Sequence, residues 1–372
     1  MPQSMQLTKI NHHAPASDAV RFGVDKAQEA AAFHRTLPDY APTPLVSLQN
    51  LASALGIASL WVKDESPRFG LNAFKGLGGS FAMHRLAEGR TGKLTFVTAT
   101  DGNHGRGVAW AAQRLGHESC VYLPRGTARE RLENILKLGA HAELLDLAYD
   151  DAVRHAASMA ERNGWILIQD TAWPGYEEIP ALIMQGYTTM GLEIAAQLGE
   201  EKPTHIFLQA GVGAMAGAMA AFFADLYGAG RPKVIIVEPD GADCIFRTAY
   251  ADDGKLHFCG DEIHTIMAGL CCGEPCTVGW EMLRSHADFA LSCADSVAAS
   301  GMRVLGRPLP GDAPIVSGES GAVTVGALCA LMSDADCAEL RSRLGLDASS
   351  AVLCISTEGD TDRENYRRIV GE

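Results

Sequence analysis

The sequence contains ten cysteines but no Cys-x-x-Cys pair, and only Cys271 and Cys272 are adjacent. Structural zinc sites and disulfide frameworks usually show paired cysteines at short, fixed spacings. The sequence therefore predicts no metal site. It favours unpaired, buried thiols in a reducing compartment.

Positive charge is also scarce. The 372 residues carry 31 Lys and Arg against 45 Asp and Glu, which gives a net charge of −14. Nucleic acids and anionic membranes are themselves negatively charged and attract basic surfaces. The charge balance argues against both as partners.

A long uninterrupted hydrophobic run is missing as well, although 47% of the residues are hydrophobic. Residues 1–20 are polar and lack the apolar core of a signal peptide, so we expect a cytoplasmic protein. The uncharged stretch 206–224 contains a Gly-x-x-x-Gly sequence, but Gln209 and a glycine-rich turn interrupt it. We predict a strand, a loop and a buried helix there.

Short apolar runs alternate with amphipathic stretches along most of the chain. This alternation is typical of α/β proteins, in which helices cover both faces of parallel sheets. The predicted strands are 59–63, 94–98, 119–123, 142–146, 165–169, 205–209, 233–238 and 352–356. The predicted helices include 105–115, 128–138, 150–163 and 180–198. Ligands of such sheets gather at the carboxyl ends of strands, which points to the turns 98–105, 209–217 and 356–362.

Lys75 follows Phe74 and precedes the glycine-rich segment 76–79. A lysine in this setting can lie partly desolvated in a cleft, which lowers its pKa and frees an amine to act as a nucleophile. Such an amine usually forms a Schiff base with a carbonyl, and pyridoxal phosphate is the common carbonyl cofactor. A surface lysine at the start of a helix is the alternative, and this segment alone does not separate the two.

A second glycine-rich turn, Gly211-Val212-Gly213-Ala214-Met215, follows the strand predicted at 205–209. Glycines let a backbone approach a phosphate closely, and the N-terminus of the following helix offers free N–H groups. The turn lacks the lysine of a P-loop, and its spacing does not match the dinucleotide fingerprint. We favour a phosphate cradle. Dinucleotide binding, which Glu238 at the end of the next strand would suit, and simple packing are the alternatives.

The turn Thr100-Asp101-Gly102-Asn103-His104 also follows a predicted strand and opens a helix. Its N–H groups and the Thr100 hydroxyl can hold a carboxylate, and Asn103 can donate to a phenolate oxygen. A helix cap by Asp101 or Asn103 is the simpler alternative. A plain cap does not require glycines on both sides of the Asn-His pair, so we favour a ligand site.

An apolar-Phe-Lys segment, a Gly-Asn-His-Gly turn and a Gly-x-Gly-x-x-x-Gly loop stand in this order. Together they resemble the fold-type II pyridoxal-phosphate enzymes, the group of tryptophan synthase β and threonine dehydratase, over about residues 40–362. Longer strings are similar to the diaminopropionate ammonia-lyase family, namely 72–75, 100–110, 169–173, 184–187 and 268–270. That family eliminates ammonia from 2,3-diaminopropionate, and hydrolysis then gives pyruvate and a second ammonia.

The resemblance implies an α/β fold of two parallel-sheet domains with pyridoxal 5′-phosphate in the cleft between them. Residues 93–178 would form a small mobile domain. It would be inserted between the two segments, 1–92 and 179–372, of a large cofactor-binding domain. A homodimer is expected on the same ground.

The resemblance also assigns roles to single residues. Lys75 would carry the cofactor as a Schiff base, and Asn103 would meet its O3′ oxygen. Ser356 would face the pyridine nitrogen, with Thr357 as the close alternative, and a neutral hydroxyl there suits an elimination. The phosphate would lie in the backbone N–H groups of Gly211, Val212, Gly213, Ala214 and Met215. The substrate would contact Thr100, Asp101, Gly102, Asn103, His104 and Asp170.

Asp101 departs from the wider group, which commonly has serine beside the substrate carboxylate. An aspartate there suits a substrate with a second ammonium group, or a position that must accept a proton. Asp170 offers a second carboxylate, so the two acids can divide their roles, although Asp170 could also be a helix cap or a satisfied loop acid. We expect Lys75 to remove the Cα proton of one enantiomer and Asp101 that of the other. Either acid could assist the leaving amine.

The nearest alternative function is a dehydratase of serine, threonine or another β-hydroxy amino acid, since the same chemistry serves a hydroxide leaving group. A β-replacement synthase is less favoured because nothing marks a second substrate site. A non-catalytic nucleotide- or cofactor-binding protein belongs to a different class. Glu319 either lines the site or caps the helix that follows it.

Overall fold

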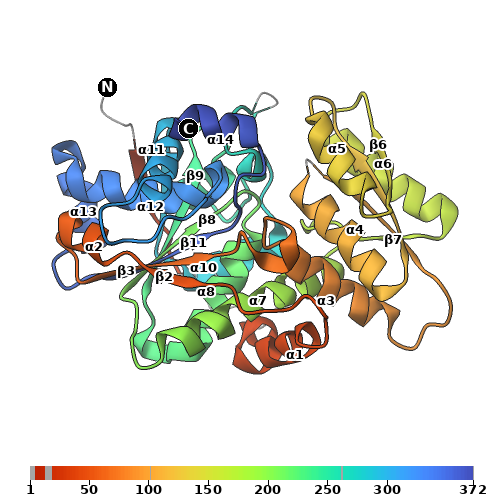
Figure 1. Cartoon of the computed structure of the whole chain (residues 1–372), viewed down its shortest axis with the longest axis horizontal. Coiled ribbons are helices and arrows are strands. Elements are labelled where there is room, and N and C mark those ends of the chain that lie inside the picture. Colours follow the sequence, from red (N-terminus) through yellow and green to blue (C-terminus); the bar gives the residue numbers. More distant parts are fainter. Residues whose placement is uncertain (1–4, 13–18, 101, 261–262, 372) are drawn as a thin grey trace.

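The computed structural model of the chain describes residues 5–12, 19–100, 102–260 and 263–371. The strands among these residues form two separate sheets, one of seven strands and one of four (Figure 1). Helices lie between successive parallel strands in both sheets. The predicted α/β class with parallel sheets is confirmed.

The larger sheet has the strand order β1-β10-β9-β8-β11-β3-β2. Its five central strands run parallel, and β1 and β2 pair antiparallel at the two edges. The central strands are mostly buried apolar runs, as expected for a parallel sheet covered on both faces. Their bounds are β1 Met5–Lys9, β2 Leu45–Ser47, β3 Ser59–Asp64, β8 His205–Gln209, β9 Lys233–Pro239, β10 Phe289–Cys293 and β11 Ala351–Ser356.

The smaller sheet has the order β6-β5-β4-β7, and all its pairs are parallel. Its strands come from one continuous part of the chain, and it lies to the right in Figure 1 with helices α4 to α6 around it. The strands are β4 Thr95–Ala99, β5 Glu118–Leu123, β6 His141–Leu144 and β7 Ile166–Leu167. The helices are α4 Asn103–Leu115, α5 Arg129–Leu136 and α6 Tyr149–Asn163.

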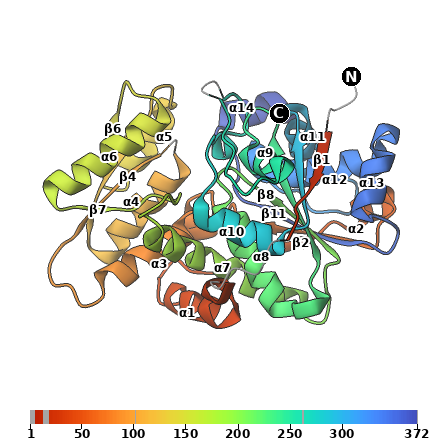
Figure 2. The same cartoon turned by 180° about the vertical axis from the view of Figure 1, so that it is seen from behind.

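Helices cover both faces of the larger sheet, so alternate residues of one strand face different cores. Leu208 of β8 packs in the core with α3, α7 and α8, whereas Phe207 packs in the core with α11 and α12. The covering helices are α1 Val24–His34, α2 Gln49–Leu55, α3 Gly76–Ala87, α7 Glu178–Leu198, α8 Ala214–Tyr227, α9 Cys244–Ala251, α10 Thr277–His286, α11 Asp295–Gly306, α12 Glu319–Ser333, α13 Ala338–Leu344 and α14 Arg363–Val370. Figure 2 shows α8 and α10, which contact each other, from behind.

Helix α3 connects the two sheets. It packs against α7, which belongs to the larger sheet's layer, and against α4 of the smaller sheet. Lys75 is the residue immediately before α3. Lys75 therefore lies at the start of the helix that contacts both layers, and Figure 1 shows where α3 runs.

The main differences from the predicted elements lie in the two edge strands, in the shortest strand, and in β10, which is a buried central strand. β1, β2 and β10 were not predicted, and the strand predicted at 165–169 is reduced to Ile166–Leu167. β1 and β2 are short antiparallel edge strands that expose part of their length, so they lack the apolar run that predicts a buried strand. Local pattern is least informative for strands of this kind.

The stretch 206–224 is strand β8, a turn and the buried helix α8, as predicted. Among the described residues, no single helix is long and apolar enough to cross a membrane. Only α12 and the segment 335–344, taken together, have the length and apolar composition of a membrane span, and the chain bends by 94° between them. Several of the cysteines, including Cys120, Cys276 and Cys354, are buried thiols.

Candidate active site

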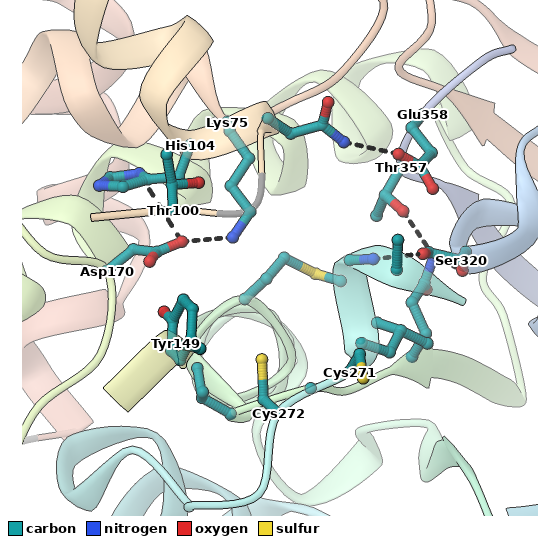
Figure 3. Close-up of a pocket in the computed structure, with 18 of the residues that line it drawn as sticks. Lys75, Thr100, His104, Tyr149, Asp170, Cys271, Cys272, Ser320, Thr357 and Glu358 are labelled. Atoms are coloured by element: carbon teal, nitrogen blue, oxygen red, sulfur yellow. Dashed lines mark hydrogen bonds and ion pairs between the residues drawn. The ribbon is translucent and has the colours of Figure 1, made fainter. Parts of the chain in front are cut away.

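A cavity of about 520 Å³ opens at the carboxyl ends of strands from both sheets. Its wall brings together the start of α3, the β4–α4 turn, the β8–α8 turn and the segment after β11 (Figure 3). The predicted site residues that line it are Lys75, Thr100, Asn103, His104, Asp170, Gly211, Val212, Gly213, Ala214, Met215 and Thr357. Gly102 and Ser356 do not line it, and Asp101 lies outside the described residues.

Glycines in α3 and α4 allow α3, α4 and α7 to pack closely around Lys75. A Cβ atom on Gly78 would lie 2.6 Å from Tyr187 Cε1 in α7. On the α4 side, a Cβ atom on Gly107 would lie 3.0 Å from the carbonyl carbon of Lys75. α7 and α4 therefore press against the backbone around Lys75, while its side chain, 23% exposed, reaches the cavity.

Three charged or titratable groups converge on this side of the cavity (Figure 3). Lys75 Nζ donates to Asp170 Oδ2, and His104 Nδ1 lies 3.6 Å from the same oxygen. His104 Nε2 donates to the carbonyl oxygen of Ile168 at 2.8 Å, which fixes a proton on that nitrogen. Burial by itself would raise the pKa of Asp170, but the charges of His104 and Lys75 outweigh it and lower the pKa to about 2. Asp170 is a carboxylate at neutral pH.

The N-cap position of α4, at the Asn103 turn, is a glycine. Gly102, with φ +153°, has no side chain that could cap the helix. The Gly102 N–H donates to Thr100 Oγ1 at 3.0 Å, and Asn103 Nδ2 donates to Glu358 Oε2 at 2.6 Å. Asn103 is thus held toward the cavity by a residue of the other sheet layer, not by its own helix. For Asn103, this arrangement favours the ligand-site interpretation over the capping one.

The β8–α8 turn has the geometry of an anion cradle. Gly213, with φ +89°, is the N-cap of α8, and as a glycine it has no side chain to cap that helix. The N–H groups of the first helical turn therefore lack intrahelical partners and face the cavity wall. A Cβ atom on Gly211 would lie 3.1 Å from Leu270 Cα and 3.3 Å from Cys272 Sγ, so glycine favours this close approach.

Glu238 does not support the dinucleotide alternative. Its carboxyl group is fully buried and accepts hydrogen bonds from the N–H groups of Ile245 and Phe246 at 2.9 and 2.7 Å. It caps the N-terminus of α9 and does not line the cavity. A ribose hydroxyl has no access to it.

The two candidate hydroxyls for the cofactor ring differ in position. Ser356 is fully buried and donates to Ser317 Oγ at 2.8 Å, away from the cavity lining. Thr357 lines the cavity, and its Oγ1 accepts a hydrogen bond from Gln209 Nε2 at 2.9 Å. Because that oxygen accepts from Gln209, its own hydrogen is left to donate.

These groups fit pyridoxal phosphate. An uncapped helix N-terminus preceded by glycines can take a phosphate, a lysine amine can take an aldehyde, and a threonine hydroxyl can donate to a ring nitrogen. All three border one cavity whose volume lies within the usual range for small-molecule sites.

Two acidic residues at this site were missed or left undecided by the sequence. Glu358 lines the cavity and holds Asn103, and no role was predicted for it. Glu319 accepts a hydrogen bond from Asn365 Nδ2 and is not a lining residue; burial and the nearby Glu358 raise its pKa to about 7. Glu358 follows the strand predicted at 352–356, so the rule that ligands gather at carboxyl ends could have found it.

Known proteins that resemble the chain agree on one family. The sequence model described as "Pyridoxal-phosphate dependent enzyme" matches residues 36–357. A diaminopropionate ammonia-lyase of Salmonella typhimurium is 48% identical over 367 residues, covering 92% of this chain and 91% of the relative. One of Escherichia coli is also 48% identical, over 372 residues, covering 94% and 92%.

Solved structures give the same result. The chain is similar to the Escherichia coli diaminopropionate ammonia lyase in complex with an aminoacrylate-PLP azomethine reaction intermediate, with TM-score 0.92, 46% identity, and coverage of 99% and 97%. The complex of the same enzyme with D-serine has TM-score 0.92 at 45% identity, with the same coverage. A threonine deaminase of Solanum lycopersicum shares the fold, with TM-score 0.78 at 20% identity, covering 100% of this chain and 97% of that one.

Proposed function

Because this chain belongs to the pyridoxal-phosphate dependent enzymes and, among them, to the diaminopropionate ammonia-lyase family, we propose that it eliminates ammonia from both enantiomers of 2,3-diaminopropionate. One observation carries the proposal beyond the family. The Lys75 ammonium is paired with the buried Asp170 carboxylate at the wall of a cavity that also holds an uncapped helix N-terminus. The predicted family, fold type, enzyme class and cofactor are confirmed by the matches.

Pyridoxal phosphate, when bound, supplies an aldehyde for amino groups and a conjugated ring that takes up the electrons of the broken Cα–H bond. Lys75 holds the aldehyde carbon, and Asn103 donates to the phenolate oxygen. Thr357 donates to the ring nitrogen, and Ser356 is the second choice because it does not line the cavity. The N–H groups of 211–215 hold the phosphate.

The residues of the chain then divide the proton transfers. Lys75 Nζ, when it is not attached to the cofactor, would remove the Cα proton of one enantiomer. Asp101 removes the proton of the other enantiomer from the opposite face. Asp170, which stays ionised at neutral pH, binds the β-ammonium group, which is already protonated and leaves as neutral ammonia with the electron pair of the Cβ–N bond.

The substrate carboxylate binds at the β4–α4 turn. Thr100 and His104 line the cavity there, and the Gly102 N–H lies next to them in the same turn. In this structure the Gly102 N–H is taken by Thr100 Oγ1, so a bound carboxylate exchanges that short-range hydrogen bond for a charged one. Overall, one diaminopropionate and one water give one pyruvate and two ammonia.

Substrate assays of the cofactor-loaded enzyme test the function. We expect pyruvate release from D- and L-diaminopropionate to exceed that from D- and L-serine by at least about tenfold in kcat/KM, because Asp170 pairs with an ammonium but not with a neutral hydroxyl. Faster turnover of either serine enantiomer would establish the dehydratase alternative. Cofactor binding without turnover of any amino acid would leave a non-catalytic binding protein.

The division of proton transfer between Lys75 and Asp101 has its own test. The Asp101→Asn variant should lose about 10²-fold or more in kcat for one enantiomer and less than about tenfold for the other. Equal losses for both enantiomers would contradict the proposed opposite faces. Absorbance of the bound cofactor serves as the control that the variant still binds it.

The remaining proposals concern movement and assembly. Residues 93–178 form the smaller, mobile domain, and 1–92 with 179–372 the larger one, so that closure shields the reacting atoms from water. The chain forms a homodimer and acts in the cytoplasm. Sedimentation at several protein concentrations tests the dimer. Hydrogen exchange with and without substrate tests whether protection changes at the boundary between the two parts.

A further inference from the structure

Glu358 contacts three other segments of the chain around the site. Its side chain is buried and accepts from Asn103 Nδ2 at 2.6 Å, a contact that joins residues 255 positions apart. A second hydrogen bond comes from Thr361 Oγ1 at 3.2 Å. Its backbone forms an isolated bridge with Ala73, two residues before Lys75. Its carbonyl oxygen also accepts from the Gly318 N–H at 3.0 Å.

The contact with Asn103 decides how that amide is oriented. A carboxylate can only accept hydrogen bonds, so the NH₂ end of Asn103 must face Glu358. One N–H is then directed at Glu358, and the second N–H of the same group is left to donate elsewhere. Since Asn103 lines the cavity, that second N–H is the one available to a ligand. Without Glu358 the amide could turn over and present its carbonyl oxygen instead.

Glu358 also places a negative charge behind the amide. It is a buried carboxylate, and its two side-chain partners given above are a neutral amide and a neutral hydroxyl. In a poorly hydrated site such a charge acts strongly on neighbouring groups. An anionic oxygen in front of Asn103 would be raised in energy by it, and any proton acceptor conjugated to that oxygen would become more basic.

We propose that Glu358 is a positioning residue for the cofactor. It locks the Asn103 amide so that one N–H meets the phenolate oxygen, and its charge keeps the neighbouring imine nitrogen of the lysine-bound cofactor protonated. This rests on the proposed function only in that Asn103 meets that oxygen. Glu358 touches Asn103 and not the reacting atoms, so it has no catalytic role of its own.

The test is the pH titration of the visible absorbance of the lysine-bound cofactor, a property that does not require turnover. In the Glu358→Gln variant the midpoint should move to lower pH by about 1 unit, because a charge that favours the protonated imine is lost. The Glu358→Asp variant keeps the charge and should stay closer to the wild-type midpoint. Thr361→Val removes the other hydrogen bond to Glu358 and leaves the charge, so its midpoint should not move.

A structural role alone predicts a different pattern. If Glu358→Gln and Glu358→Asp both lower the Tm while both midpoints remain at the wild-type value, the proposal is wrong. A midpoint that moves to higher pH in Glu358→Gln would also overturn it. If Glu358→Gln does not fold, the Thr361→Val midpoint decides. This variant keeps the charge, so an unchanged midpoint supports the proposal and a shift of about 1 unit to lower pH contradicts a charge effect. Failure of the proposed function is seen separately, as a wild-type enzyme that binds the cofactor but does not release pyruvate.

Discussion

Two lysine–carboxylate pairs lie on either side of the same loop, one fully buried and one at the cavity. Lys63 pairs with Glu193 at 2.7 Å, and Lys75 pairs with Asp170. Lys63 is fully buried and donates all three of its hydrogens, to Thr43 O, Glu193 Oε2 and Gln197 Oε1 at 2.7 to 2.9 Å. Lys75 instead borders the cavity and is 23% exposed.

Lys63 and Glu193 belong to a buried ion network with Glu65 and Arg68, called here the closed cluster, whereas Lys75 and Asp170 are called the open pair. Arg68 donates to both Glu65 and Glu193, and all three side chains are at most 4% exposed. Burial would raise the pKa of Glu193, but the hydrogen bonds and charges of Arg68 and Lys63 lower it to about 2. Every charge there has partners of opposite sign, which is what a buried ion network requires.

This comparison indicates that the surroundings of a lysine amine decide whether it can act as a nucleophile. A network with every donor committed is rigid and unreactive, whereas a pair at a cavity can exchange its partner for a ligand. The two are also linked along the chain, since Arg68 lies seven residues before Lys75. Between them Phe69 and Asn72 hold left-handed φ values of 53° and 58°. Each such residue costs about 1 kcal/mol or more, so the closed cluster stabilises the strained loop that presents the open pair.

The largest expected effect comes from a variant that removes the lysine of the open pair. The Lys75→Ala variant should lose about 10³-fold or more in pyruvate formation, because both the cofactor attachment and one base are removed. The Tm of the cofactor-free protein should change by only a few degrees, since Asp170 can be hydrated from the cavity. Borohydride reduction should attach the cofactor covalently to the wild type and not to the variant. Residual activity within about tenfold of wild type would mean that another amine does the chemistry.

The next largest effect is expected for a substitution in the closed cluster. Arg68→Met should destabilise the protein by about 3–5 kcal/mol in urea unfolding, because Glu65 and Glu193 keep only one buried cation between them. Arg85→Met is the matched control. Arg85 is 38% exposed and pairs with Glu88 at 3.2 Å, so its loss should cost less than about 1 kcal/mol. Similar losses for the two variants would remove the distinction between closed and exposed networks.

Asp170→Asn addresses the acid of the open pair. We expect kcat for diaminopropionate to fall by about 10²-fold, through loss of the carboxylate that binds the leaving amine. The pKa of Asp170 is lowered to about 2, so it is ionised above that pH and protonates only below it. The wild-type rate profile should therefore show no limb from Asp170 between pH 5 and 8. A limb in that range that disappears in the variant would contradict the ion pair.

The smallest effect concerns Glu319, beside the open site. Its pKa is raised from 4.5 to about 7, so between these values the folded state binds more protons than the unfolded state. The stability that protonated Glu319 contributes is complete at pH 4 and is lost as the pH rises through 7. Glu319→Gln cannot lose a proton. It should be more stable than wild type at pH 8 by on the order of 2 kcal/mol, and equal to it at pH 4. A difference that does not depend on pH would contradict this.

The sequence predicted much of the site from local pattern alone. Apolar alternation located the parallel strands, and the carboxyl-end rule pointed to three turns that all border the cavity. The glycine-rich segments after Lys75 and after β8 were informative because a Cβ atom on Gly78 or Gly211 would come very close to a neighbouring residue. The edge strands were missed because they pair with only one neighbour and lack a buried apolar run.

What the sequence determined by itself is the set of chemical groups: an amine, two glycine-rich turns at helix starts, and acids near them. These follow from residue type and short-range spacing, which the chain carries wherever it folds. Only the tertiary structure decided which groups work together. It separated Lys75 from Lys63, and Thr357 from Ser356, by placing one of each pair at the cavity. It also brought Glu358 to Asn103 across two sheet layers, a contact that depends on packing and that no local pattern encodes.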